Sequence, residues 1–397
     1  MTAERVEAGH PLLIRVSGQD QPRVINELLT LLADAGAAIE DMEQLVVRER
    51  LTLDVLARID GADSGLVRDI LYWGHTKKLT VDFEHVEAIS QRATLPRHAI
   101  TVLGERLSAA TLAAVSGAVA DTGGTIDRIV RLATEPVTAY DFAVIAGDVD
   151  VMRSSLLQVA RDQQVDIAVQ AGGLERRAKR LVVMDVDSTL IRNEVIDLLA
   201  DEADCSEQVV AITERAMQGE LDFEGSLRER VRLLRGLDEA AIDRVRDRIS
   251  LTPGARTFVR TLKRLGYAVA VVSGGFTVFT GWLQDQLGLD HAYANTLEIV
   301  DGRLTGEVLG GVVDRARKAE LLAEIAAAEG IPLSQTVAVG DGANDLDMLA
   351  AAGMGIAFNA KPAVREQAEV TVSVPYLDAI LFMLGLRGTD VDKGEVA

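Results

Sequence analysis

The stretch LVVMDVDSTL, residues 181–190, combines a strand signal with two closely spaced carboxylates. Residues 181–184 form a continuous apolar run, which is typical of a strand buried on both faces of a parallel sheet. Asp185 and Asp187 follow directly and are separated by one residue. Side chains at positions i and i+2 of a strand point to the same face, so these two like charges would repel one another. Solvent at a strand end or a bound cation would relieve that repulsion.

Three further apolar runs alternate with helical patterns and predict an α/β fold with a parallel sheet. The runs are YAVAVVS (267–273), TVAVGD (336–341) and GIAF (355–358). A helical, strongly charged stretch interrupts this alternation after the first strand. We therefore expect a Rossmann-like domain over 181–397 that carries a helical cap at about 193–250.

Polar residues stand at the ends of three of these four strands. In open parallel sheets, ligands bind outside the carboxyl ends of the strands, so distant parts of the sequence would meet there. Carboxylates suit a hard cation such as Mg²⁺, whereas hydroxyl, amide and ammonium groups suit a phosphoryl group. The residues expected to converge are Asp185, Asp187, Ser273, Gly274, Gly275, Asp341, Asn344 and Asp345.

The residue spacing does not match the motifs of three other kinds of site. A calcium-binding EF-hand loop that began at Asp185 would need glycine and glutamate where the chain has Leu190 and Ile196. No P-loop is present, and Ser273 lacks the preceding glycine of a nucleophile elbow. The lysine most suited to join the site is Lys318, at an expected helix start in DRARKAELL, residues 314–322.

The order DVDST (185–189), SGG (273–275), Lys318 and GDGAND (340–345) resembles the four motifs of the haloacid dehalogenase superfamily of aspartate-nucleophile phosphatases. The resemblance spans about 181–375. It implies that Asp185 attacks phosphorus to form an aspartyl phosphate, and that Asp187 is the general acid and base. It also implies a Mg²⁺ cofactor held by Asp185, the Asp187 carbonyl and Asp341. The residues it assigns to the phosphate are Ser273, Gly274 and Lys318, with Asn344 and Asp345 in support.

The insertion resembles the cap of phosphoserine phosphatases, in NEVIDLLADEA (193–203) and ITERAMQGELDFEGSLRERVRLL (212–234). By this resemblance Glu194 binds the substrate ammonium and Arg230 its carboxylate, while Met217 and Phe223 close over the substrate. A zwitterionic substrate needs one anion and one cation beside the phosphate site, which agrees with this assignment. The alternative is an ordinary charged helix face formed by Arg228, Arg230 and Arg232 with Glu224 and Glu229.

Two copies of one βαββαβ unit are predicted before the α/β domain, at 9–92 and 96–172, followed by a linker at 173–180. The first copy has Gly18 after its first strand, and Asp20 is expected to cap the helix that follows. The second copy has Gly104 at the matching place. The copies resemble ACT domains, which bind amino acids, so Gly18, Asp20 and Gly104 are the implied effector-binding residues.

Composition restricts the partners of this 397-residue chain. Its formal net charge of −20 and pI of about 4.7 argue against nucleic acid or a membrane surface as the main partner. Cys205 is the single cysteine, and the five histidines show no ligand spacing. The N-terminal residues lack the apolar core of a signal peptide, so we expect a cytoplasmic protein.

The two resemblances together imply a Mg²⁺-dependent phosphatase that acts on phosphoserine in the last step of serine synthesis, with serine as the effector that binds the ACT-like repeats. Homodimers or larger homo-oligomers would form through the ACT-like repeats. Two alternatives stay open. The scaffold could act on another small phosphomonoester or transfer its phosphate, or the chain could be an amino-acid sensing regulatory protein.

Overall fold

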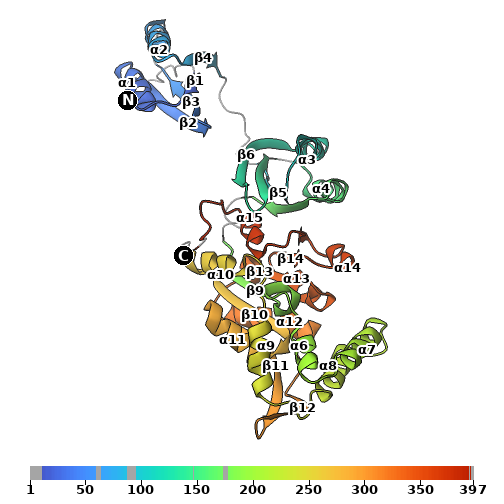
Figure 1. The fold of residues 1–397 in the computed structure, drawn as a ribbon. Coiled ribbons are helices and arrows are strands. Elements are labelled where there is room, and N and C mark those ends of the chain that lie inside the picture. The colour runs from blue at the N-terminus through green and yellow to red at the C-terminus, as the bar shows by residue number, and fades with distance from the viewer. Residues whose placement is uncertain are drawn as a thin grey trace, which may run out of the picture. The chain divides into compact units, whose positions relative to one another are not determined.

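The structure is a computed structural model that describes residues 11–59, 64–86, 95–145, 147–172, 178–392 and 394. The chain divides into two compact units, Met1–Thr94 and Leu95–Ala397 (Figure 1). The first unit contains one βαββαβ repeat, and the second contains another repeat together with the α/β domain. Residues 173–177 of the predicted linker lie outside the described residues.

The first repeat is an antiparallel sheet with two helices. Strands β1 (Pro11–Gln19), β2 (Ala38–Val47), β3 (Arg50–Arg58) and β4 (Thr80–His85) pair in the order β2-β3-β1-β4. Helices α1 (Val24–Asp34) and α2 (Ser64–Lys77) pack on alternate strand residues such as Ile14, Val16 and Leu53, which are fully buried. The predicted cap at Asp20 is wrong, because α1 begins after Arg23, whose φ of 71° places it in the left-handed region.

The second repeat has the same order of elements. Strands β5 (Arg97–Gly104), β6 (Thr125–Ala133), β7 (Thr138–Ile145) and β8 (Asp166–Ala171) pair as β6-β7-β5-β8, with helices α3 (Ala109–Asp121) and α4 (Val149–Gln163). The Ser108 hydroxyl accepts the Thr111 amide at 3.0 Å and so caps α3. The predicted duplication is therefore confirmed at the level of topology.

The α/β domain contains a seven-stranded sheet in the order β12-β11-β10-β9-β13-β14-β15. The four predicted strands are β9 (Leu181–Met184), β10 (Ala268–Phe276), β13 (Thr336–Gly340) and β14 (Gly355–Phe358), and they pair in parallel. The sequence interpretation missed the short parallel strand β15 (Val370–Val372) and the antiparallel pair formed by β11 (His291–Val300) and β12 (Arg303–Leu309).

Helices cover the sheet and form the cap. The cap comprises α6 (Val195–Glu202), α7 (Ser206–Met217), α8 (Phe223–Arg232) and α9 (Ala240–Arg248), which lie between β9 and β10 in the chain. The other helices are α10 (Ala255–Arg264), α11 (Thr277–Leu287), α12 (Arg315–Ala328), α13 (Leu346–Ala351), α14 (Pro362–Arg365) and α15 (Ile380–Met383). No helix in the described ranges is long and apolar enough to cross a membrane.

The second repeat docks on the α/β domain through the sheet face that its own helices leave uncovered. Leu103 and Ala168 from this face share one buried hydrophobic core with Ile380 of α15. The Gln170 amide donates to the Met383 carbonyl at 2.8 Å, and β8 lies beside β15. Asp166 accepts hydrogen bonds from the segment that contains β15 and the residue after it. The carboxyl ends of the parallel strands therefore belong to the same compact unit as this repeat.

Candidate active site

The two aspartates after β9 have different surroundings. The chain leaves the strand in a tight turn over 186–190, in which Ser188 adopts a left-handed φ of 57°. One carboxylate oxygen of Asp185 accepts the Val186 amide at 2.8 Å. One oxygen of Asp187 instead accepts the amide of Val195, the first residue of the cap helix α6, also at 2.8 Å. The turn thus directs Asp185 toward the sheet end and Asp187 toward the cap.

Lys318 joins two of the predicted motifs in a buried ion-pair network. Its Nζ lies 2.9 Å from Asp185 Oδ1 and 2.7 Å from Asp345 Oδ1, and its side chain is fully buried. Burial opposes the charge of this lysine, but the two carboxylates outweigh burial and raise its pKa. The other oxygen of Asp345 accepts the Gly342 amide at 2.9 Å. The ammonium therefore compensates the negative charge of Asp185, and Asp345 fixes both Lys318 and the loop after β13.

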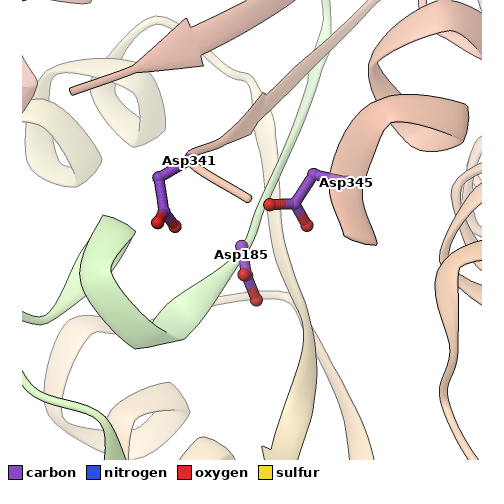
Figure 2. Close-up of side chains that lie close together, drawn as sticks. All are labelled: Asp185, Asp341 and Asp345. Carbon is purple, nitrogen blue, oxygen red and sulfur yellow. The ribbon is translucent and has the colours of Figure 1, made fainter. Parts of the chain in front are cut away.

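Three carboxyl groups gather at the ends of β9 and β13, as Figure 2 shows for Asp185, Asp341 and Asp345. One oxygen of each lies within 4.8 Å of the others. Burial raises the pKa of Asp341 to about 6, with a further contribution from Asp345, and burial raises the pKa of Asp185 well above its usual range. A bound cation would favour the ionised forms, so the residues present fit Mg²⁺.

Asp345 is the least suited of the three carboxylates to bind a cation directly, because Lys318 and Gly342 already occupy its two oxygens. Asp341 accepts a single hydrogen bond at 3.0 Å, from the buried Thr189 hydroxyl, and lines an open cavity. The assignment of Asp185 and Asp341 as the carboxylate ligands stays a prediction. Thr189 was not singled out in the sequence, although it belongs to the same motif as Asp185.

Asp187 is placed to exchange a proton near neutral pH. Burial raises its pKa to about 7, and the charge of Glu194 adds to this effect. Its second oxygen accepts the Ser273 hydroxyl at 3.2 Å, and that hydroxyl accepts the Gly275 amide at 2.8 Å. A methyl group at Gly275 would lie 2.8 Å from Asp187 Oδ2, so a glycine is required for this close approach. The end of β10 thus orients the carboxyl of Asp187.

A cavity of about 560 Å³ lies between these strand ends and the cap. Phe223 at the start of α8 reaches over the strand end, since a Cβ on Gly274 would lie 3.0 Å from Phe223 Cζ. The side chain of Met217, a predicted lining residue, lies outside the described residues. Lys318 and Ser273 are buried beneath the cavity and do not line it. The predicted site residues that line the cavity are Asp185, Asp187, Glu194, Phe223, Arg230, Gly274, Gly275, Asp341 and Asn344.

Glu194 and Arg230 provide an anion and a cation in the cavity wall. Glu194 accepts the Ser188 hydroxyl at 2.7 Å, and burial raises the pKa of its carboxyl. Arg230 donates from Nε to the Ser226 carbonyl at 3.3 Å, and burial lowers the pKa of its guanidinium. The Arg230 guanidinium forms no ion pair within the described part of the chain, whereas Arg228 pairs with Glu224 at 2.8 Å. The alternative of a charged helix face therefore describes Arg228 but not Arg230.

Two charged residues of the cavity lining were missed in the sequence, Asp197 and Lys361. Asp197 lies one helical turn after Glu194, and its charge acts on Arg230. The i, i+3 spacing from Glu194 could have suggested Asp197, because such residues share a helix face. Lys361 follows β14 and precedes the short helix α14, where no motif marks it.

The predicted effector residues occupy matching places in the two repeats. Gly18 is the penultimate residue of β1, and Gly104 is the last residue of β5. A Cβ at Gly18 would lie 2.5 Å from the Leu79 side chain, and one at Gly104 would lie 3.2 Å from Val165. Asp20 is exposed and donates its backbone amide to the Glu49 carbonyl at 2.8 Å. Their role in effector binding stays a prediction.

The fold and the site are those of a haloacid dehalogenase-type α/β hydrolase, and comparison with family models gives the same assignment. Residues 182–350 match the haloacid dehalogenase-like hydrolase family. Residues 10–84 and 96–170 each match an ACT domain model, so the repeats are ACT domains. We refer to them below as the first and second ACT domains.

Relatives that match along the whole chain identify the family more narrowly. Phosphoserine phosphatase of Streptomyces coelicolor is 51% identical over 100% of this chain and 97% of its own length. Phosphoserine phosphatase SerB2 of Mycobacterium tuberculosis is 46% identical over 97% of this chain and 95% of its own length. The crystal structure of a probable phosphoserine phosphatase from Vibrio cholerae is 36% identical with a TM-score of 0.59, covering 76% of this chain and 89% of that one. The chain belongs to the phosphoserine phosphatase family.

Proposed function

We propose that the protein is a Mg²⁺-dependent phosphatase that hydrolyses O-phospho-L-serine to L-serine and phosphate, the last step of serine biosynthesis. One observation carries this proposal. The cavity contains a reaction centre, Asp185 and Asp187, and beside it a carboxylate and a guanidinium, Glu194 and Arg230. Phosphoserine presents a phosphate to the first pair and an ammonium and a carboxylate to the second.

In the first step, a carboxylate oxygen of Asp185 attacks phosphorus and the bond from phosphorus to the serine oxygen breaks. Asp187 gives its proton to the departing oxygen, which a carboxyl with a pKa of about 7 can do near neutral pH. Lys318, 2.9 Å from Asp185, holds the nucleophile in place. The products of this step are serine and an aspartyl phosphate on Asp185.

In the second step, Asp187 accepts a proton from a water molecule, whose oxygen attacks the same phosphorus. The bond between phosphorus and Asp185 breaks, so phosphate leaves and both aspartates return to their starting state. The Ser273 hydroxyl and the Val195 amide keep Asp187 oriented through both steps, since each donates to one of its oxygens.

Asp185, Asp341 and the Asp187 carbonyl would hold Mg²⁺, as the donor set of the site allows. When bound, the ion supplies positive charge to the phosphoryl oxygens and to the carboxylates that surround them. The Thr189 hydroxyl, bonded to Asp341 at 3.0 Å, keeps that carboxylate at the ends of β9 and β13. The loop over 340–345 is fixed in turn by Asp345.

The proposal also includes regulation by an effector, assembly into oligomers and a location in the cell. ACT domains suggest ligand binding, and we propose serine as a feedback effector at Gly18 and Asp20, with homodimers or larger homo-oligomers formed through these domains. A cytoplasmic location is proposed on the composition. The second ACT domain differs at the matching loop, which has Gly104-Glu105-Arg106 in place of Gly18-Gln19-Asp20.

A substrate panel tests the proposed activity. The chain should hydrolyse phosphoserine with a higher kcat/KM than phosphothreonine or phosphoglycolate in the presence of Mg²⁺. Arg230→Ala should lower kcat/KM for phosphoserine roughly 10- to 100-fold, because a charged hydrogen bond contributes about 1.5–3 kcal/mol. The kcat/KM of the variant for p-nitrophenyl phosphate should change little, because that substrate has no carboxylate.

Arg228→Ala is the matched control, because Arg228 lies on the same helix and pairs with Glu224 outside the cavity lining. It should leave the preference for phosphoserine unchanged. Equal losses on both substrates in Arg230→Ala would contradict the substrate assignment.

A further inference from the structure

The cavity of the proposed phosphatase site is unusually acidic for a site that must admit an anion. Its basic lining residues, among those that the structure describes, are Arg230 and Lys361. Lys318 does not change this balance, because Asp185 and Asp345 already pair with it beneath the cavity. The acidic residues that line the cavity are Asp185, Asp187, Glu194, Asp197 and Asp341.

Lys361 differs from the other cations of the site because its ammonium is available. The side chain is exposed, and it has no hydrogen-bond or ion-pair partner among the described residues. Lys361 lines the same cavity as Glu194, so its side chain belongs to the cavity wall. Arg230, by contrast, is largely buried and hydrogen-bonded to a carbonyl of its own helix.

The backbone that bears Lys361 is fixed although the side chain is not. Just before it, the Asn359 amide donates to the Val372 carbonyl at 2.7 Å, which ties the segment to β15. Pro362 follows and restricts Lys361 to its extended conformation, with φ of −63° and ψ of 152°. The Lys361 carbonyl accepts the Val364 and Arg365 amides at 3.0 and 3.1 Å. A long cationic side chain therefore extends from a rigid base at the cavity.

We propose that Lys361 is a substrate-binding residue that attracts the anionic substrate into the cavity and contacts its phosphate as it enters. The proposal rests on the proposed phosphatase function. Mg²⁺ held by Asp185 and Asp341 would compensate those two carboxylates, but an approaching phosphomonoester dianion also meets Asp187, Glu194 and Asp197. A protein of net charge −20 supplies no general attraction for such a ligand. Lys361 is the exposed positive charge that the cavity presents to such a ligand, whereas Lys318 and Arg230 act deeper in the site.

The test compares Lys361→Gln with wild type at low and high ionic strength, on phosphoserine and on p-nitrophenyl phosphate. Lys361→Gln should lower kcat/KM roughly tenfold at low salt, mostly through KM, because electrostatic attraction acts before chemistry. Salt screens exposed charges, so the deficit should shrink as ionic strength rises. Lys361→Arg should restore most of the loss.

Arg365→Gln is the matched control, since it removes the same charge from the same short helix but lies outside the cavity lining. It should keep kcat/KM within about twofold of wild type, as an exposed charge remote from the ligand would. A normal kcat/KM in Lys361→Gln at low salt, or a loss confined to kcat, would overturn the proposal. If the wild-type protein hydrolyses p-nitrophenyl phosphate but not phosphoserine, the substrate assignment alone is contradicted. The role of Lys361 is then tested with p-nitrophenyl phosphate.

Discussion

The two ACT domains share a topology, but the sheet faces turned away from their helices differ. In the first domain this face carries Arg15 paired with Asp54 at 3.2 Å, and both side chains are substantially exposed. In the second domain the corresponding pair is Thr101 and Asp141, as the strand registers show. Apolar residues surround that pair, among them Leu103, and they belong to the core shared with the α/β domain.

The difference shows that one fold can present either an exposed sheet face or a face that packs on another domain. The helix-covered faces keep equivalent apolar residues, because each sheet must bury one face to be stable. In the second domain the other face carries apolar residues that pack on the α/β domain. In the first domain the corresponding face carries the exposed Arg15–Asp54 pair.

The largest expected effect comes from charging the docking face. Leu103 is fully buried in the shared core, so Leu103→Asp should lower the free energy of unfolding by about 3 kcal/mol or more, because the carboxylate would be buried without a partner. Urea unfolding followed by circular dichroism and by activity measures this loss. Ser17→Asp, at the matching position of the first domain, should cost far less. Equal losses would contradict the distinction between the two faces.

A smaller effect is expected at Asp166, which connects the second ACT domain to the segment around β15. Its oxygens accept the Thr371 hydroxyl at 3.2 Å, the Ser373 amide at 2.7 Å and the Ser373 hydroxyl at 2.9 Å. Asp166→Ala leaves these donors without an acceptor and should cost about 1–3 kcal/mol. Asp162→Ala, an exposed change in the same domain, is the control and should be nearly neutral. A neutral Asp166→Ala would show that the hydrogen bonds of Asp166 do not contribute to docking.

The stability that Asp166 contributes should depend on pH. Burial raises its pKa in the folded protein above the unfolded value of about 3.9. A carboxyl with a raised folded pKa contributes stability that is complete below the unfolded pKa and is lost as pH rises through the folded pKa. The difference in unfolding free energy between wild type and Asp166→Asn should therefore grow as pH falls. A difference that shrinks on acidification would contradict the direction of this shift.

The next expected effect is a difference between the two ACT domains in effector binding. If serine binds at the first ACT domain, Gly18→Ala should raise the serine concentration for half-maximal inhibition at least roughly fivefold, since its Cβ would lie 2.5 Å from the Leu79 side chain. Gly104→Ala should have less effect, because its loop lacks the aspartate. Inhibition assays at fixed phosphoserine measure both. Unchanged inhibition in Gly18→Ala would indicate that serine acts in the active site as product.

The smallest effect is expected on the charged face of the first domain. Arg15→Ala removes an exposed pair with Asp54, and such pairs contribute about 0–1 kcal/mol. The melting temperature of Arg15→Ala should therefore fall by no more than a loss of about 1 kcal/mol would cause. The decrease should be smaller at high salt, because salt screens exposed charges. A loss as large as that of Asp166→Ala would mean that this face is itself buried against a partner.

The sequence predicted those parts of the site that short motifs encode. Asp185, Asp187 and Asp341 follow apolar strands directly, so parallel-sheet geometry alone brings them together. Lys361 and Asp197 were missed because their positions depend on how the cap and the segment after β14 fold back over the sheet. Strand β15 has three residues and no periodicity to detect. The docking of the second ACT domain depends on which sheet face is covered, which alternation within one strand does not reveal.

The central claim is that Asp185 attacks the phosphorus of phosphoserine. Turnover of phosphoserine with Mg²⁺ is quenched in acid, and peptides are analysed by mass spectrometry for a phosphoryl group on the peptide that contains Asp185. We predict that wild type carries this group during turnover, and that Asp185→Asn carries none and is inactive. Phosphoserine hydrolysis at the wild-type rate by Asp185→Asn, or a phosphoryl group on another residue alone, would contradict the account.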